Sequence, residues 1–204
     1  MTKQKVTIID TGCANLSSVK FALNRLGVEC CVSADESIIN NSDKLILPGV
    51  GTAVAAMENL KSRNLPAIIH ACRKPILGIC LGMQMLGEES EESMNTNVTS
   101  IKGLGVVSGT IKLLKVGNLP LPHMGWNQVE HDGTSPLFKG IPSGSYFYFV
   151  HSYAMNITSD TVATCTYGEE FTAVVNHENY FGTQFHPEKS GKIGAKLLQN
   201  FLDM

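Results

Sequence analysis

Short apolar runs alternate with helix-like repeats over the first half of the chain. Val6 to Asp10 has the pattern of a buried strand. The apolar residues that follow recur at helical spacing until Gly27, and Asn15 is placed to cap that helix. The same patterns predict further strands at 28–32, 45–47 and 75–79, and further helices at 52–60 and 66–72. Strands that alternate with helices predict a parallel α/β sheet with helices on both faces.

The second half of the chain has a different, β-rich pattern. Gly, Pro and Asn separate its apolar runs, and a last strand at 180–185 precedes a predicted helix at 194–201. The other β-rich runs lie at 105–114, 145–151, 161–167 and 172–176. No repeat or low-complexity linker divides the 204 residues, so we expect one domain over residues 1–204.

Composition narrows the class of protein. With a net charge of -2 and no basic or acidic block, the sequence gives no support for nucleic-acid or membrane-surface binding. No apolar run reaches the roughly 20 residues of a membrane helix. No signal-peptide pattern is evident either, so we expect a cytoplasmic protein. The six cysteines form no C-x-x-C pair and no zinc-site spacing, which predicts reduced thiols and neither metal nor other cofactor.

One cysteine stands where a nucleophile would be expected. Cys80 lies at the centre of G-x-C-x-G (78–82), between a predicted strand and a helix, as in a nucleophile elbow. Glycines two residues to either side leave room for a tight turn. The turn would project the sulfur from the strand end and place it at a helix N-terminus, whose dipole favours the thiolate. The alternative is a buried structural cysteine beside helix-packing glycines.

A histidine and a carboxylate follow the last predicted strand. Pro187 disfavours a helical conformation for His186 and keeps it extended. Residues two apart in an extended chain point the same way, so the imidazole and the Glu188 carboxylate lie side by side. The carboxylate can accept from one ring nitrogen and leave the other facing a thiol. Alone, the motif would also fit a surface turn. With the elbow, it predicts a triad of Cys80, His186 and Glu188.

These motifs resemble those of the class I (triad) glutamine amidotransferases. The resemblance rests on L-P-G-V-G (47–51), G-I-C-L-G-M-Q-M (78–85) and Q-F-H-P-E (184–188), in this order. Three further segments, at 10–16, 122–127 and 148–153, are similar to the glutaminase subunits of imidazole glycerol phosphate synthases. The similarity covers essentially the whole chain. It implies a flavodoxin-like α/β fold and hydrolysis of the side-chain amide of glutamine.

The resemblance also implies roles for residues around the triad. Backbone N–H groups of Val50 and Leu81 would stabilise the oxyanion of the reaction. Because glycines flank Val50, its peptide could flip at low cost, so we expect weak activity until a partner and its ligand bind. The family pattern places the substrate glutamine against Gly49, Gly51, Gly82, Gln84, Glu92, Ser152 and Tyr153.

A partner is expected because free ammonia protonates in neutral water and then no longer acts as a nucleophile. The resemblance implies a heterodimer with a (β/α)8-barrel cyclase subunit, which together would make imidazole glycerol phosphate in histidine biosynthesis. Trp126, the only tryptophan, suits an interface anchor, although core packing would also explain it. The expected interface residues are His123, Met124, Trp126, Asn127 and Lys189.

Other functions remain possible at this level. The chain could be the glutaminase subunit of another synthase, for pyridoxal phosphate or guanylate. It could be a catalytically inactive binding module that regulates a partner, although the retention of all three triad residues speaks against this. It could also be a cysteine hydrolase of peptides, against which Gln84 in the elbow helix favours glutamine.

Overall fold

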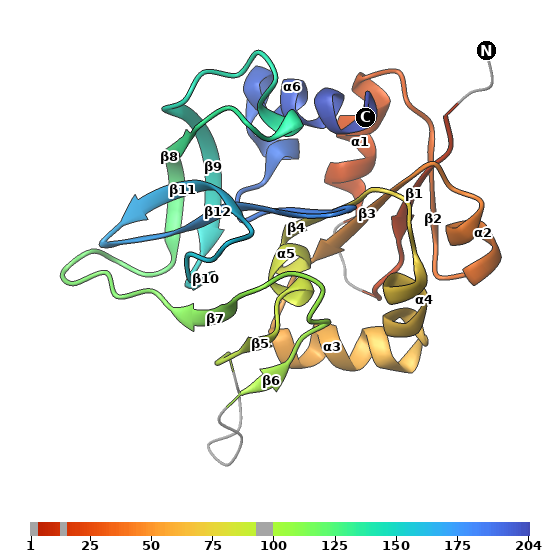
Figure 1. Ribbon diagram of the computed structural model, residues 1–204, viewed down its shortest axis with the longest axis horizontal. Helices are drawn as coiled ribbons and strands as arrows, with labels where there is room; N and C mark the ends of the chain where they lie inside the picture. Colours follow the sequence, from red (N-terminus) through yellow and green to blue (C-terminus); the bar gives the residue numbers. More distant parts are fainter. Residues whose placement is uncertain (1–3, 13–15, 93–99) are drawn as a thin grey trace.

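The computed structural model describes residues 4–12, 16–92 and 100–204 (Figure 1). The predicted cap at Asn15 lies outside these residues. Six α-helices are assigned in the described part: α1 (Ser17–Arg25), α2 (Glu36–Asn40), α3 (Ala53–Ser62), α4 (Leu65–Ala71), α5 (Leu81–Leu86) and α6 (Gly191–Leu202). In the same residues, no helix is both long and apolar enough to span a bilayer. Two 3-10 helices, η1 (Pro136–Phe138) and η2 (Pro187–Lys189), lie in the second half of the chain.

The described strands form one sheet of thirteen. Its main path runs β2-β1-β3-β4-β13-β12-β10-β7-β5-β6, while β11 joins β12 to β8, and β8 pairs with β9. The first-half strands are β1 (Val6–Ile9), β2 (Cys30–Ser33), β3 (Lys44–Gly49), β4 (Ile76–Cys80) and β5 (Glu89–Ser90). The others are β6 (Ile101–Lys102), β7 (Thr110–Leu113), β8 (His123–His131), β9 (Ser145–His151), β10 (Tyr153–Met155), β11 (Thr161–Tyr167), β12 (Glu169–His177) and β13 (Tyr180–Thr183).

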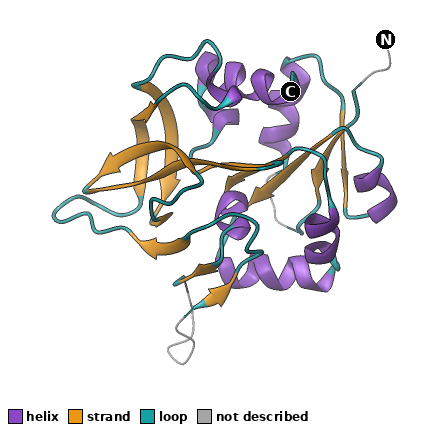
Figure 2. Cartoon of the chain, in the orientation of Figure 1, coloured by secondary structure: helices purple, strands orange, loops and turns teal. Residues whose placement is uncertain are grey.

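The parallel part of the sheet carries helices on both faces, as predicted (Figures 1 and 2). Strands β2, β1, β3, β4 and β13 run parallel. Successive residues of a strand point to opposite faces: in β3, Leu45 and Leu47 join a core cluster with α3 and α4, while Ile46 joins another with α1 and α6. Because both faces of β1, β3, β4 and β13 are covered, every residue of these four strands is buried, whereas the edge strand β2 is partly exposed.

The second half forms antiparallel structure, which confirms the predicted β-rich region. Strand β12 runs antiparallel to β13, and β8 and β9 form a two-stranded ribbon that β11 connects to the rest of the sheet. The nine-residue strand β8 was not predicted from its pattern. One of its buried positions is the polar His123, and the strand also contains Gly125, whose φ is 131°. Helix α2 was also missed; its five residues are held by Asp35, whose side chain accepts from two backbone N–H groups.

Candidate active site

A strained turn joins the end of β4 to the start of α5. Cys80 occupies it with φ 54° and ψ -112°, a conformation that few residues other than glycine adopt. The neighbouring glycines are needed for close packing. A Cβ on Gly82 would lie 1.9 Å from the backbone oxygen of Leu47, and one on Gly78 would lie 2.8 Å from the backbone of Gly82. The predicted elbow is therefore present, and β3 packs directly against it.

Replacing Gly82 by alanine is expected to destabilise the fold by about 3 kcal/mol, because the obstructing atom is backbone and cannot rotate away. Urea unfolding would measure the change. Gly133→Ala is the matched control, since that glycine has a positive φ but open space around its missing side chain, and we expect it to cost only about 1 kcal/mol. Equal losses in the two variants would contradict the role assigned to the close approach.

His186 and Glu188 form a buried pair beyond the end of β13. The imidazole Nδ1–H donates to Glu188 Oε1 over 2.8 Å, and the two side chains are 8% and 4% exposed. The backbone holds the histidine as well: its N–H donates to the Tyr148 carbonyl, and its carbonyl accepts from the Ser190 hydroxyl. The remaining ring nitrogen, Nε2, is buried without a hydrogen-bond partner among the described residues. It is thus available for chemistry.

Electrostatics link this pair to Cys80. Burial opposes protonation of the His186 imidazole, but its interactions with Cys80 and Glu188 outweigh this and raise its pKa from 6.5 to about 9. The imidazole is therefore protonated at neutral pH, a charge that favours a neighbouring thiolate. The structure brings the three predicted triad residues together, with Cys80 only 9% exposed.

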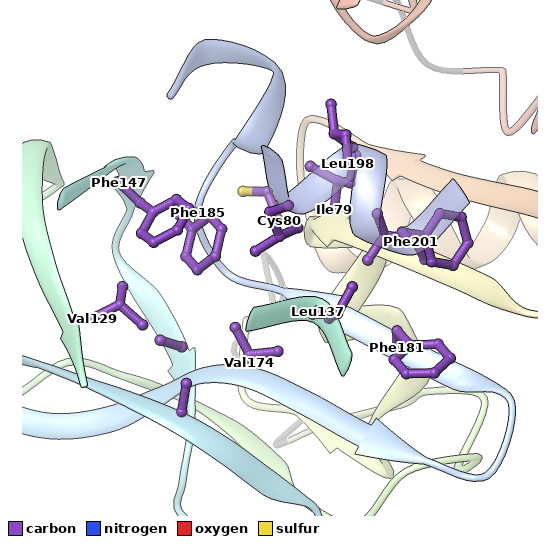
Figure 3. Close-up of a cluster of buried hydrophobic side chains, with 14 of the residues drawn as sticks. Ile79, Cys80, Val129, Leu137, Phe147, Val174, Phe181, Phe185, Leu198 and Phe201 are labelled. Carbon is purple, nitrogen blue, oxygen red and sulfur yellow. The ribbon is translucent and has the colours of Figure 1, made fainter. Parts of the chain in front are cut away.

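The Cys80 sulfur lies near two polar groups. It lies 3.9 Å from the Val150 carbonyl oxygen and 3.8 Å from the side-chain nitrogen of Gln184. Figure 3 shows it pointing toward the part of the core where Phe147 and Phe185 lie, whose rings stack with centroids 4.1 Å apart. Cys80 and these two phenylalanines belong to the same buried core cluster.

The sequence matches the family described as glutamine amidotransferase class-I over residues 7–204. The chain belongs to the class-I glutamine amidotransferases. Similar proteins include the "Imidazole glycerol phosphate synthase subunit HisH" of Vibrio vulnificus, 56% identical over all of both chains. The protein of the same name from Photobacterium profundum is 54% identical, covering 100% of this chain and 99% of that one.

Solved structures share the amidotransferase fold at lower identity. PurLQS from Thermotoga maritima matches with a TM-score of 0.72 and 22% identity, covering 99% of each chain. A glutamine amidotransferase from the same organism matches with a TM-score of 0.67 and 17% identity, covering 100% of this chain and 84% of that one. These likenesses and the sheet order confirm the expected fold class.

A loop of this amidotransferase passes directly beside the elbow. Gly49 is the sheet partner of Cys80, and a Cβ on it would lie 2.6 Å from the Gly82 nitrogen. Val50 is exposed, and Gly51 has a φ of 94°. The Glu92 carboxylate accepts from the Ala53 N–H at the start of α3, and burial, only partly offset by that bond, raises its pKa. The predicted positions 49–51, Glu92 and the nucleophile therefore gather at one place.

Gln84 lies inside the protein, beside β10 and the chain segment that follows β13. It is buried, and its side-chain nitrogen donates to the Tyr153 carbonyl over 2.8 Å and to Gln184 Oε1 over 2.9 Å. Both of its N–H donors are thus used inside the protein, and the remaining polar atom of its side chain is the acceptor Oε1; contact of Gln84 with glutamine stays a prediction. Gly82 likewise packs against β3. The carbonyls of Ser152 and Tyr153 already accept from Leu114 N and Gln84.

The predicted interface residues divide into two groups. Met124 and Trp126 are 63% and 54% exposed, so core packing does not explain Trp126; Lys189 is exposed and Asn127 half-buried. His123 is only 3% exposed, and its ring stacks between those of Phe149 and Tyr167. The side chain of His123 is therefore enclosed by rings of its own subunit, and its direct contact with a partner stays a prediction.

Two residues at the site carried no role in the sequence analysis. Gln184 was noted only as the first residue of the His186 motif, and His151 only within a similar segment. In the structure Gln184 contacts the nucleophile, and His151 pairs with His123 through nitrogens 3.0 Å apart. Their spacing along the chain gave no signal for either contact. Among the described residues, no group of His, Cys, Asp or Glu is arranged to hold a metal ion.

Proposed function

We propose that this chain is the glutamine-hydrolysing subunit of an imidazole glycerol phosphate synthase that acts in the cytoplasm and supplies ammonia to a barrel cyclase subunit. The observation that carries the proposal is the buried Cys80–His186–Glu188 arrangement. The full-length similarity to proteins named as HisH subunits supports the choice of synthase.

The proposed reaction begins with attack of the Cys80 thiolate on the side-chain amide carbon of glutamine. Negative charge then develops on the former carbonyl oxygen. The N–H of Leu81 is suited to stabilise it, because the first N–H groups of a helix have no partner within that helix. The Val50 N–H would supply a second donor from the exposed loop beside Cys80.

Breakdown of this intermediate requires a proton for the departing nitrogen. His186 is protonated at neutral pH and would deliver it, so that ammonia leaves and a γ-glutamyl thioester remains on Cys80. The neutral imidazole then removes a proton from water, which attacks the thioester and releases glutamate. Glu188 keeps the ring oriented and balances its positive charge throughout.

The surface proposed for the partner is one face of the β8–β9 ribbon. Met124 and Trp126 lie on it opposite Val150 and Tyr148, and Tyr146 adds a third large exposed side chain. The other face of the ribbon is buried in the core. Since the carbonyls of Val150 and Tyr148 contact the Cys80 sulfur and the His186 N–H, this apolar face lies next to the triad.

Trp126→Ala is expected to weaken binding of the barrel subunit by roughly 30-fold or more, because exposed aromatic anchors commonly contribute about 2 kcal/mol or more to an interface. Isothermal titration calorimetry with the purified subunit would measure it. Leu119→Ala, which removes another exposed apolar side chain, is the control and should bind normally. Unchanged affinity of the Trp126 variant would exclude the anchor role.

A mixing assay tests the proposed function as a whole. The chain, glutamine and the barrel cyclase subunit with its substrate should together yield glutamate and imidazole glycerol phosphate in equal amounts. A glutaminase of another synthase would give no imidazole product, and an inactive binding module would give no glutamate. A peptide hydrolase would cleave peptides in preference to glutamine. Any of these three outcomes would overturn the proposal.

A further inference from the structure

A directed chain of hydrogen bonds runs beneath the β8–β9 ribbon. The Asn127 amide nitrogen donates to Thr166 O over 2.9 Å and contacts His123 Nε2 at 3.2 Å, while its oxygen accepts from the Gln128 N–H. The amide orientation is thus fixed, and His123 Nε2 must be an acceptor. The only ring proton of a neutral His123 then sits on Nδ1, which points at His151 Nε2.

The second histidine is fixed in the same sense. His151 Nδ1 lies 2.9 Å from the Tyr153 carbonyl, which can only accept, so Nδ1 carries the proton and Nε2 receives the one from His123. Burial lowers the pKa of His123 to about 4. Burial also lowers the pKa of His151, to about 3. The charges of His123 and His186 add to this shift, and the hydrogen bond to the Tyr153 carbonyl opposes it. Both rings are therefore neutral at pH 7, as these tautomers require.

The chain meets the nucleophile at one backbone carbonyl. The Tyr153 carbonyl oxygen accepts from His151 and also from Gln84. These two hydrogen bonds use both lone pairs of that oxygen. The second N–H of Gln84 donates to Gln184 Oε1, and this orients the Gln184 amide so that its nitrogen faces the Cys80 sulfur at 3.8 Å. An unbroken series of contacts thus joins Asn127 to the sulfur.

One end of this series lies on the strand that bears the proposed docking surface. His123 and Asn127 project from the buried side of β8, while Met124 and Trp126 project from its exposed side. His123 and His151 are direct partners in the β8–β9 ladder, so any shift of β8 changes the bond between them. The other end is an amide that stabilises a thiolate if its N–H points at the sulfur.

We propose that Gln184 is a positioning residue for the Cys80 thiolate. The hydrogen-bond chain Asn127–His123–His151 then transmits the position of β8, through Tyr153 and Gln84, to the Gln184 amide. The proposal rests on the proposed role of Cys80 as nucleophile. It goes further by assigning a task to His123, His151, Gln84 and Gln184, none of which touches the substrate in this scheme.

Alkylation of Cys80 by iodoacetamide, followed peptide by peptide with mass spectrometry on the full chain, tests the proposal without substrate or partner. Gln184→Met removes the N–H and keeps the length of the side chain; we expect it to slow Cys80 labelling at pH 7 by roughly 10-fold, as for a hydrogen bond to a charged group. His123→Phe preserves the ring stacking but interrupts the chain of hydrogen bonds. We expect this variant to label Cys80 about fivefold more slowly.

The controls separate a positioning effect from a loss of fold. The exposed Cys31 in the same molecules should be labelled at an unchanged rate, and Gln128→Ala, on β8 but outside the chain, should label Cys80 normally. If His123→Phe does not fold, Asn127→Leu breaks the same chain at its half-buried end. In the complex, the Gln184 and His123 variants should lower kcat for glutamine while KM stays within about twofold.

Each outcome has a defined meaning. Normal Cys80 labelling in Gln184→Met would overturn the role of the amide. Slow labelling in Gln184→Met with normal labelling in both His123→Phe and Asn127→Leu would overturn the link to β8. Because labelling requires no glutamine hydrolysis, these results stand apart from a failure of the proposed function, which the mixing assay reports.

Discussion

Cys80→Ala is expected to lower glutamine hydrolysis by the complex on the order of 10⁶-fold, since removal of a triad nucleophile elsewhere has that effect. The turn at Cys80 holds its sulfur at the end of β4, next to a protonated imidazole, and the described part of the site offers no second thiol there. Glutamate release measured by a coupled assay would report the loss. Diazo-oxo-norleucine should also no longer attach to the chain.

Cys31→Ala is the matched control for this result, because Cys31 is an exposed free thiol far along the sheet on β2. It should retain full activity and full labelling by the glutamine analogue. Appreciable hydrolysis in Cys80→Ala would mean that water attacks glutamine directly and that no thioester forms. Labelling of a residue other than Cys80 in the unaltered chain would lead to the same conclusion.

Glu188→Gln is expected to reduce kcat by roughly 10³- to 10⁴-fold, as for the corresponding acid-to-amide change in other triads. The amide keeps the shape of the side chain but removes the negative charge beside His186 Nδ1. It can also present an N–H to Nδ1 and so favour the wrong tautomer. Both effects lower the pKa of His186 from about 9, because one of the interactions that raise it is lost.

The direction of this pKa change gives a second measurement. In the unaltered protein the imidazole keeps its proton up to about pH 9, whereas in Glu188→Gln it should lose it at lower pH, as NMR titration of the ring protons would show. Glu58→Gln, at an exposed position of α3, is the control and should change neither kcat nor the titration. A Glu188→Gln enzyme within tenfold of normal activity would contradict the orienting role of the carboxylate.

Local sequence patterns predict the elements that hold the triad but not all of its neighbours. The elbow is predictable because a short motif encodes its turn, and the His186–Glu188 pair because proline and a two-residue spacing fix it. The His123–His151 pair is different. Its members are separated in sequence, and their contact depends on the register of β8 against β9, which no local pattern specifies.

The same limit explains why the burial of two predicted site residues was not foreseen. Gln84 has the position in the elbow helix that the family pattern links to glutamine, yet burial and two internal acceptors direct it inward. His123 stands beside the exposed Met124 in the sequence, but alternate residues of a strand face opposite sides. Burial of a polar side chain is a tertiary property, and it decides which members of a motif reach the surface.

Cys80 ends β4, and His186 follows shortly after the end of the neighbouring parallel strand β13, whose Gly182 is aligned with Gly78 of β4. Sliding one strand past the other by a single residue would displace the imidazole by about 3.3 Å and turn every side chain to the opposite face. Alignment of the reacting groups is therefore a property of the whole ladder rather than of the triad. We expect catalysis to survive gentle heating unimpaired and to vanish in the same cooperative transition that melts the sheet.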